Sequence, residues 1–207
     1  MDVVHTIALT LGVGWAAGLN LYAAIFMLGV LGNTGNLELP AGLAICADPL
    51  VMGAAGLMYC VEFFADKVPG VDTTWDAIHT FIRIPAGAVL AAGAVGELGA
   101  GAELAAALVG GGLAAGSHAT KAGTRLLVNT SPEPFTNIGA SIGEDVAVFA
   151  GLWTALNYPL VFLALLAAFV LFAIWILPKI ARAVAALARK IRGWFQRGAE
   201  SPSDAAS

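Results

Sequence analysis

The chain alternates long apolar runs with short polar stretches along its 207 residues. A transmembrane helix needs about 20 apolar residues to cross roughly 30 Å of hydrocarbon, and most of the runs approach that length. The pattern therefore predicts an all-α fold, a polytopic transmembrane helical bundle of about six spans. The expected spans lie near residues 7–31, 48–65, 74–96, 103–122, 141–156 and 159–178.

Short motifs mark where several of these helices begin and end. Asp48-Pro49 opens the second span, because proline is suited to the first helical turn. The segment 157–159, Asn-Tyr-Pro, predicts a tight turn between the last two spans, since proline disfavours helix at the residue before it. Two pairs have the spacing of a capping box and predict helix starts: Thr73 with Asp76, and Ser141 with Glu144.

The first apolar run has no Lys or Arg before it and exceeds the roughly 7–15 apolar residues of a signal-peptide core. We expect it to be retained as the first span. Asn20 is the only strongly polar side chain deep in this run. It predicts either a hydrogen bond to a neighbouring helix, the usual role of such a residue in lipid, or a place in a binding site.

A basic, amphipathic segment follows the last span. Residues 179–197 place apolar side chains at helical spacing and Lys or Arg over the remaining surface. This pattern predicts an interfacial helix that lies in the headgroup layer and attracts anionic membrane lipids. A stop-transfer flank that only fixes the topology is the favoured role over any binding role. We expect three parts: a transmembrane helical domain (1–178), this helix (179–197) and a disordered polar tail (198–207).

Composition and charge agree with a membrane location. Hydrophobic residues make up 59% of the chain and charged residues 12%, with a mean hydropathy of +0.84. Soluble domains average about a quarter charged residues. All ten Lys and Arg fall on one side of the expected six-span topology. The positive-inside bias then predicts that both termini are cytoplasmic. We expect a multi-pass protein of the cell membrane, such as a bacterial inner membrane, and no nucleic-acid partner.

Ionisable residues gather in two stretches between apolar runs. In the first, Val61 to Gly87, a helix would place Asp76, His79, Thr80 and Arg83 on one face. A central Asp or Arg costs roughly 2.5–3.5 kcal/mol in a bilayer, so such a stripe is expected to face the bundle interior or a water-filled cavity. Snorkelling of Arg83 to the membrane interface is the alternative.

The second stretch, His118 to Asp145, repeats this arrangement. His118, Lys121 and Arg125 share one helical face, and prolines after them predict an irregular segment. Capping of the fifth span is the alternative role for Glu144. Capping alone does not explain why the acids of this stretch lie on the same side of the membrane as the cations.

We hypothesise that the two stretches form the charged internal site of a carrier or channel-like protein for a small anionic solute or a lipid phosphate group. Opposed charges that re-pair between two states give a bistable gate, and histidine titrates near neutral pH. The candidate substrate-binding residues are Lys67, Arg83, Lys121, Arg125 and Asn20. The candidate gating or proton-relay residues are Glu62, Asp66, Asp72, Asp76, His79, His118, Glu133, Asn137, Glu144 and Asp145.

Two other functions fit the same residues. One is an intramembrane enzyme on lipid head groups, with Mg²⁺ held by carboxylates such as Asp72 and Asp76, although such sites are too generic to predict from sequence. The other is a structural or assembly subunit in which the charges join helix hairpins. The sequence has no Gly-Lys-Ser/Thr phosphate loop, HExxH or paired CxxC motif. We therefore expect no cofactor and rank an enzyme behind a transporter.

Two weaker patterns concern repetition and self-association. A shift of 54 residues aligns Lys67 with Lys121 and Phe81 with Phe135, which predicts a parallel internal repeat of spans two and three in spans four and five. Small-residue pairs allow close helix contacts, either within one bundle or in a homo-oligomer. These pairs are Gly14-x-x-x-Gly18 and Gly112-x-x-x-Gly116.

The charged stretches contain the motifs ADKVPGVDTTWDAIHTFIRIPAGA and HATKAGTRLLVNTSPEPFTN, and the first span contains GLNLY. These residues resemble the domain of unknown function 4126 family of small integral membrane proteins, over nearly all of positions 10–160. The family carries proline where Leu21 stands here, a departure that leaves the charged stretches unchanged. The resemblance implies a polytopic membrane protein and brings no established activity, so no catalytic role is transferred.

Overall fold

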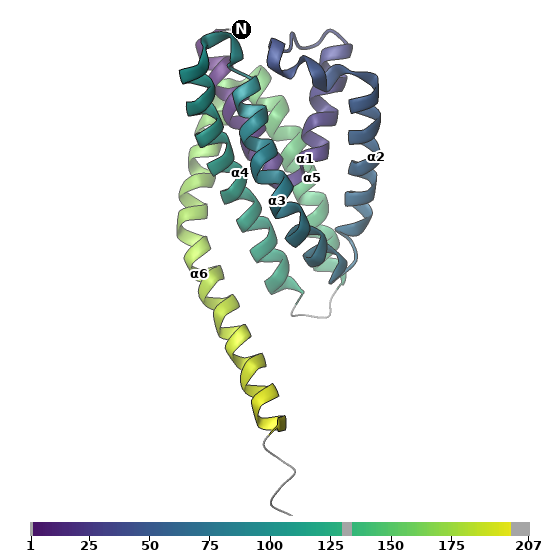
Figure 1. Cartoon of the computed structure of the whole chain (residues 1–207), viewed down its shortest axis with the longest axis vertical. Coiled ribbons are helices and arrows are strands. Elements are labelled where there is room, and N and C mark those ends of the chain that lie inside the picture. Colours follow the sequence, from purple (N-terminus) through teal and green to yellow (C-terminus); the bar gives the residue numbers. More distant parts are fainter. Residues whose placement is uncertain (1, 130–133, 200–207) are drawn as a thin grey trace, which may run out of the picture.

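The computed structural model describes residues 2–129 and 134–199. Within them the chain is helical, as predicted, and a long helix overlaps each expected span. The helices pack side by side as an elongated bundle (Figure 1). Their bounds are α1 (Val3–Asn33), the 3-10 helix η1 (Ala41–Ala47), α2 (Pro49–Ala65), α3 (Val71–Gly93), the 3-10 helix η2 (Gly96–Leu98), α4 (Ala100–Val128), α5 (Pro134–Asn157) and α6 (Pro159–Ala199).

Three helices are long and apolar enough, by length and composition, to cross a bilayer: α1, α4 and the Pro159–Lys190 part of α6. The bent pair of η1 and α2, with 67° between its members, is a fourth candidate. These helices identify a membrane protein. The number of six spans stays a prediction, since α3 and α5 are not among the candidates in the described part of the chain.

The helix α1 is broken at Asn20, whose backbone angles (φ −149°, ψ 96°) are not helical. Its two arms fold back, so that both ends of α1 lie at the same end of the bundle (Figure 1). Thr6 of the first arm and Glu38, just after the second, line one cavity. A straight helix would separate Thr6 from Asn33 by about 40 Å, too far for five further residues to return. A helical hairpin with a buried tip therefore replaces the predicted uninterrupted first span.

Small residues allow the first arm of this hairpin to lie directly on α4. A Cβ atom at Gly14 would be 2.7 Å from the Cα atom of Gly110, and one at Gly18 would also meet α4 backbone. The first predicted small-residue pair is thus used within the bundle. No described atom lies within 4 Å of the Cβ position at Gly112 or Gly116. The predicted homo-oligomer stays a prediction.

Two predicted helix boundaries are confirmed. Asp48 is the N-cap of α2 and accepts a hydrogen bond from the backbone N–H of Leu50 at 2.8 Å, with Pro49 in the first turn. The helix α5 ends at Asn157 and α6 begins at Pro159. Both motifs act locally, which is why the sequence predicts them.

Both capping-box predictions are wrong. The helix α3 begins at Val71, after Gly70, whose φ of 87° favours glycine. The helix α5 begins at Pro134, so that Ser141 and Glu144 lie in its interior. The polar side chains of these motifs bind buried cations or neighbouring helices, and their spacing reflects an inward face rather than a helix start. The residues concerned are Thr73, Asp76, Ser141 and Glu144.

The helix α6 passes through Pro178 without a break and extends beyond the bundle (Figure 1). The basic residues 179–197 therefore continue α6 instead of forming a separate helix. Ile180 is still buried and lies against Gly123 of α4. An interfacial location for this segment stays a prediction, and the predicted tail lies outside the described residues beyond Ala199.

The N-terminus lies with η1 and η2 at one end of the bundle, and α6 extends from the opposite end (Figure 1). The cause is the hairpin, because α1 returns to the end from which it starts. The six-span topology expects the two chain ends together. The described ends are apart in the structure.

Candidate functional site

The two predicted polar stretches meet inside the bundle, around the tip of the α1 hairpin. Apolar residues of α3 point outward instead, and Ile78 and Phe81 are 58% and 82% exposed. The helical faces predicted from the spacing are therefore confirmed, while the roles assigned to these residues stay predictions. The buried members are Asn20, Glu62, Asp66, Asp72, Asp76, His79, Arg83, His118, Lys121, Arg125, Asn137, Ser141 and Asp145. We call this set, with Glu144, the buried cluster.

Arg83 of α3 is fully buried, which excludes the snorkelling alternative. Its Nη2 donates to Glu62 Oε1 of α2 at 2.5 Å, and its Nη1 donates to Asp76 Oδ1 at 3.0 Å. The same Nη1 lies 3.5 Å from the carbonyl oxygen of Gly18, near the hairpin tip. Arg83 thus joins α1, α2 and α3 through charge-assisted hydrogen bonds.

Lys121 of α4 is shared among several carboxylates. Its Nζ lies 2.8 Å from Asp66 Oδ2 and 3.3 Å from Glu62 Oε1, both in the α2 region. It also lies 3.4 Å from Glu144 Oε2 of α5. A further bond goes to the carbonyl oxygen of Leu19 at 3.0 Å. Because an ammonium group has three donors, Lys121 can exchange partners within this arrangement.

Arg125 of α4 forms the third centre. Its Nη2 donates to Glu144 Oε2 at 2.5 Å and its Nε to Glu144 Oε1 at 3.3 Å, a bidentate pair. Its Nη1 donates to the carbonyl oxygen of Asp66 at 2.6 Å and to Asn137 Oδ1 at 3.3 Å. Asp72 Oδ2 lies 3.6 Å from the same Nη1. Arg125 therefore binds α5 to the connection between α2 and α3.

His118 is neutral in this arrangement. Its Nδ1 accepts from Arg83 Nη1 at 3.1 Å, because a guanidinium group only donates. Its Nε2 lies 2.7 Å from Thr80 Oγ1, which itself donates to the carbonyl oxygen of Asp76. The ring proton therefore sits on Nε2. Protonation of Nδ1 would require His118 to lose its bond to Arg83.

His79 connects α3 to the second arm of α1. Its Nδ1 donates to the carbonyl oxygen of Trp75 at 2.8 Å, and its Nε2 lies within hydrogen-bond distance of the Tyr22 hydroxyl, at 3.1 Å. The imidazole also stacks on the Trp75 ring, with 4.2 Å between ring centroids. His79 therefore ties α3 to α1 through one hydrogen bond and packs on an aromatic ring of its own helix.

The cluster itself holds the break in α1. Asn20 Oδ1 accepts from the backbone N–H of Ala23 at 2.9 Å, so Asn20 is the N-cap of the second arm. Its Nδ2 donates to Asp145 Oδ1 of α5 at 3.1 Å, which confirms the predicted hydrogen bond to a neighbouring helix. The last carbonyl groups of the first arm, at Gly18 and Leu19, accept from buried cations. The polar backbone exposed by the break is thus satisfied inside the protein.

Carboxylates outnumber cations in the buried cluster. Six carboxylates face the three fully buried cations of the described residues, and each of those cations already holds two or more acids. Buried ions cost several kcal/mol each unless they are paired. Four carboxylate oxygens have no hydrogen-bond partner among described atoms: Glu62 Oε2, Asp66 Oδ1, Asp76 Oδ2 and Asp145 Oδ2. The cluster therefore has spare acceptors for protons or cations.

The described residues contain no group of three or more His, Cys, Asp or Glu side chains arranged to hold a metal ion. Asp72 accepts from Asn129 at 2.8 Å and Asp76 from Arg83 at 3.0 Å. The two carboxylates proposed for Mg²⁺ thus bind different partners. Both would have to be released before they could share an ion.

Three predicted site residues lie at the margin or beyond it. Lys67 is half-buried, donates to Ser141 Oγ at 3.3 Å and makes no ion pair within 4 Å with a described residue. Its environment differs from that of Lys121, with which the predicted repeat aligns it, and the repeat stays a prediction. Glu144 keeps 17% of its side chain exposed. Glu133 lies outside the described residues.

Sequence reasoning missed three residues that complete the site. Asn129 donates to both oxygens of Asp72, and Tyr22 bonds His79. Ser117 Oγ donates to the carbonyl oxygen of Trp15 at 2.8 Å. Tyr22 and Asn129 stand in the quoted GLNLY and VNTS segments. The polar side chains of Tyr22 and Asn129, close in sequence to other site residues, were the signal from which their place in the site could have been predicted.

Replacing Asn20 by alanine is expected to lower the free energy of unfolding by about 1–2 kcal/mol, the usual loss of an N-cap. The change removes the cap of the second arm and leaves Asp145 without its described partner. Thermal unfolding in detergent, followed by circular dichroism, measures the effect. The control is Asn157→Ala, because Asn157 is exposed and bonds only its own helix at Trp153. Equal stability of the two variants would contradict this role of Asn20.

The family model described as Domain of unknown function (DUF4126) matches residues 7–179, which contain all but the first four residues of α1 and the whole buried cluster. No curated protein and no solved structure matches the chain. This membrane protein therefore belongs to the family of the Domain of unknown function (DUF4126).

Proposed function

We propose that this protein is a transporter or channel-like protein in which the buried cluster re-pairs between two conformations. The break of α1 at Asn20 supports this best. Non-helical backbone at membrane depth is tolerated only inside protein or beside a water-filled cavity. Secondary transporters build their solute sites at the ends of such discontinuous helices. Here the carbonyl end of one arm and the capped start of the other both face the cluster.

The position of Lys121 supports a re-pairing mechanism. Four carboxylates from α2, α3 and α5 lie within 4 Å of its Nζ, so a small shift of α4 changes which acid holds the ammonium group. Networks that offer several pairings of similar energy give two discrete packings rather than gradual deformation. These pairings tie α4 to the α2 region through Glu62 or Asp66, to α3 through Asp76, or to α5 through Glu144. Lys121 is therefore the switching residue of the proposal.

The charge of the cluster bears on the solute. The sequence-based version of this proposal has an anion, a small solute or a lipid phosphate group, bound by the cations. Such an anion would have to displace acids such as Glu144, which holds Arg125 at two points. The excess of carboxylates instead favours a solute or coupling ion of positive charge. We therefore propose that the transported solute or coupling ion is a cation or a proton. Transport of an anion is the competing outcome of the test.

The distribution of charge supports an orientation in the cell membrane, as in a bacterial inner membrane. The exposed end of α6 is basic and the opposite end of the bundle is acidic. By the positive-inside bias, the end of α6 faces the cytoplasm and the N-terminus faces the other side. This differs from the expectation of two cytoplasmic termini. The basic residues are Lys179, Arg182, Arg189, Lys190 and Arg192, and the acidic residues are Asp2, Glu38, Asp48, Glu97 and Glu103.

Two other candidate functions compete with this proposal, and one of them, the structural subunit, is an outcome of the test. A Mg²⁺-dependent enzyme on lipid head groups has weaker support, since Asp72 and Asp76 bind separate partners. A structural subunit uses the same ion pairs only to join helices. It differs from a transporter because it moves no ion or solute across the membrane.

The test uses proteoliposomes of the protein adsorbed on a solid-supported membrane. The electric current is measured after a jump in pH, in the concentration of hexyltrimethylammonium chloride or in the concentration of sodium phosphate. We expect a current for protons or the organic cation that Lys121→Met abolishes, because methionine keeps the chain length and removes the switching charge. Lys179→Met, exposed on α6, is the matched control and should leave the current unchanged.

A current from phosphate alone would return the proposal to an anionic solute. No current from any of the three jumps, with protein that is folded by circular dichroism, would overturn the transporter and favour the structural subunit. A current that persists in the Lys121→Met protein would remove the switching role from this residue.

A further inference from the structure

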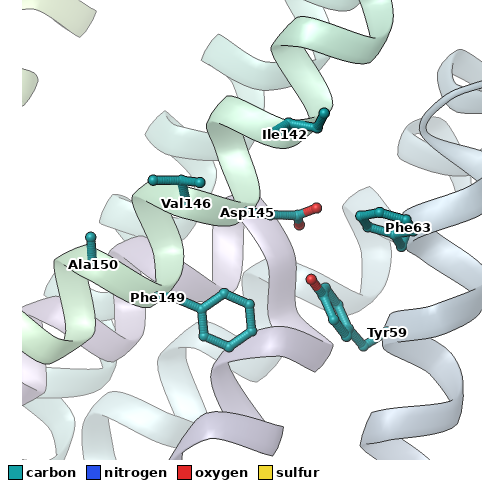
Figure 2. Close-up of a pocket in the computed structure, with 7 residues that line it drawn as sticks. All are labelled: Tyr59, Phe63, Ile142, Asp145, Val146, Phe149 and Ala150. Atoms are coloured by element: carbon teal, nitrogen blue, oxygen red, sulfur yellow. The ribbon is translucent and has the colours of Figure 1, made fainter.

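A lateral groove opens between α2 and α5 beside the buried cluster. Its volume is about 370 Å³, and its lining comes from one face of each helix. Figure 2 shows the Asp145 side chain pointing from α5 toward Tyr59 and Phe63 on α2. The other lining residues are Ile142, Val146, Phe149 and Ala150. The groove is thus apolar and aromatic, with one carboxylate.

That carboxylate is buried and incompletely partnered. Asp145 is only 8% exposed, and its Oδ1 accepts from Asn20. Its Oδ2 has no hydrogen-bond partner among described atoms, and no described cation lies within 4 Å of it. A buried charge of this kind is costly unless a counter-charge is bound. Lys121 and Lys67 act on Asp145 only through longer-range attraction. The Asp145 Oδ2 atom therefore stays available for direct contact with a cation at the inner end of the groove.

The aromatic side chains of the groove suit an ammonium group in particular. The rings of Tyr59 and Phe149 meet edge to face, with 5.7 Å between centroids. The Lys67 ammonium nitrogen already lies 2.9 Å from the centroid of the Phe63 ring. Aromatic faces attract cations electrostatically, and aromatic cages are a known means of binding quaternary ammonium groups. One wall of the groove thus already holds an ammonium group of the chain itself.

The outer rim of the groove is apolar. Ile142 and Val146 are 48% and 59% exposed on the α5 side. In a membrane protein such exposed apolar side chains contact acyl chains, because lipid is their solvent. The groove therefore leads from the bilayer to Asp145. A ligand that fills it needs one positive head and one apolar chain.

We propose that the groove between α2 and α5 binds an amphipathic organic cation from the bilayer. The ammonium group lies between the Asp145 carboxylate and the rings of Tyr59 and Phe149, and the apolar chain lies along Ile142 and Val146. Asp145, which contacts the bound ammonium group, also accepts a hydrogen bond from Asn20 at the tip of the hairpin. The ligand is therefore separated from that tip by a single side chain. The inference relies on the proposed function only for the role of this ligand as a solute, since binding requires no transport.

The test is binding of hexyltrimethylammonium chloride to the full chain in nanodiscs, measured by isothermal titration calorimetry with empty nanodiscs subtracted. We expect saturable binding that weakens at least about tenfold in Asp145→Asn, equivalent to roughly 1.4 kcal/mol. Asparagine keeps the shape of the side chain and an oxygen that accepts from Asn20. The neutral analogue 1-hexanol should bind both proteins equally.

A second variant tests the aromatic part of the groove. Tyr59→Leu is expected to weaken binding of the cation by about 2- to 30-fold, the range of one cation–π contact. Phe64→Leu is the matched control on the same helix, because Phe64 is 67% exposed and does not line the groove. Its affinity should equal that of the unchanged protein.

Equal binding of the cation to the unchanged, Asp145→Asn and Tyr59→Leu proteins would overturn the inference. Binding of 1-hexanol as tight as that of the cation would do the same, since the groove would then hold an acyl chain only. Cation binding without any current in the liposome test would support this site and count against transport. A current in the liposome test without binding of the cation to the groove would support transport and count against this site.

Discussion

Replacing Arg83 by methionine is expected to cause the largest loss of stability, about 3–5 kcal/mol, the usual cost of removing one partner from a buried ion pair. Methionine fills much of the arginine volume but has no charge and no donor. Glu62 and Asp76 would lose the cation that holds them, and the Gly18 carbonyl would lose its described side-chain donor. Water cannot replace these bonds, because the side chains of Arg83, Glu62 and Asp76 are at most 1% exposed.

Unfolding in detergent, followed by circular dichroism, measures the loss. Arg182→Met is the control, because Arg182 is exposed on α6 and bonds only the carbonyl oxygen of Pro178. Surface changes of this kind usually stay within about 0.5 kcal/mol. The double variant with Arg83→Met and Glu62→Gln should recover part of the stability, since it also removes the unpaired charge. A loss in Arg83→Met no larger than in the control would mean that the buried pairs do not stabilise the bundle.

Replacing Gly14 by alanine is expected to lower stability by about 1–3 kcal/mol, the range for overpacking a well-packed interior. The new Cβ atom would stand 2.7 Å from the Cα atom and 2.9 Å from the carbonyl oxygen of Gly110. Both are backbone atoms and cannot rotate away. The first arm of α1 and the helix α4 would have to separate, which also shifts the carbonyl groups that bind Lys121 and Arg83.

The second small-residue pair supplies the control. Gly112→Ala and Gly116→Ala place a Cβ atom where no described atom lies within 4 Å. Alanine favours a helix over glycine by about 0.5–1 kcal/mol, so these variants should be as stable as the unchanged protein or slightly more stable. The same unfolding measurement compares all three. A loss at Gly112 equal to that at Gly14 would indicate a contact between copies of this chain and contradict the assignment of the close contact to α1 and α4.

The inward faces of the helices follow from the sequence because they depend on helical periodicity alone. Polar residues on α3 and α4 recur at three- and four-residue spacing, as Asp76, His79 and Arg83 show, and water is absent from the membrane interior. Such residues must face protein, so their burial could be predicted. The cap at Asp48 is equally local. The sequence also predicts a membrane protein and motivates the hypothesis that its two charged stretches form one site, and the structure brings these stretches together.

The break of α1 was decided by the tertiary structure alone. The residues around Asn20 form a continuous apolar run that favours an unbroken helix. The break persists because Asn20 donates a hydrogen bond to Asp145, more than a hundred residues later in the chain. Lys121 in turn donates to the carbonyl oxygen of Leu19, which the break leaves without a helical partner. No local pattern contains these partners.

The pairing of charges was also beyond the sequence. Three buried cations and six carboxylates allow many combinations, and all of them satisfy the same composition and periodicity. Only the packing of α2, α3, α4 and α5 determines that Glu144 holds Arg125 at two points and that Asp145 Oδ2 has no hydrogen-bond partner among described atoms. Helix formation and burial are therefore encoded locally along the chain. The break, the ion pairs and the incompletely partnered Asp145 arise from contacts between distant segments, because electrostatic partners are chosen by distance in space.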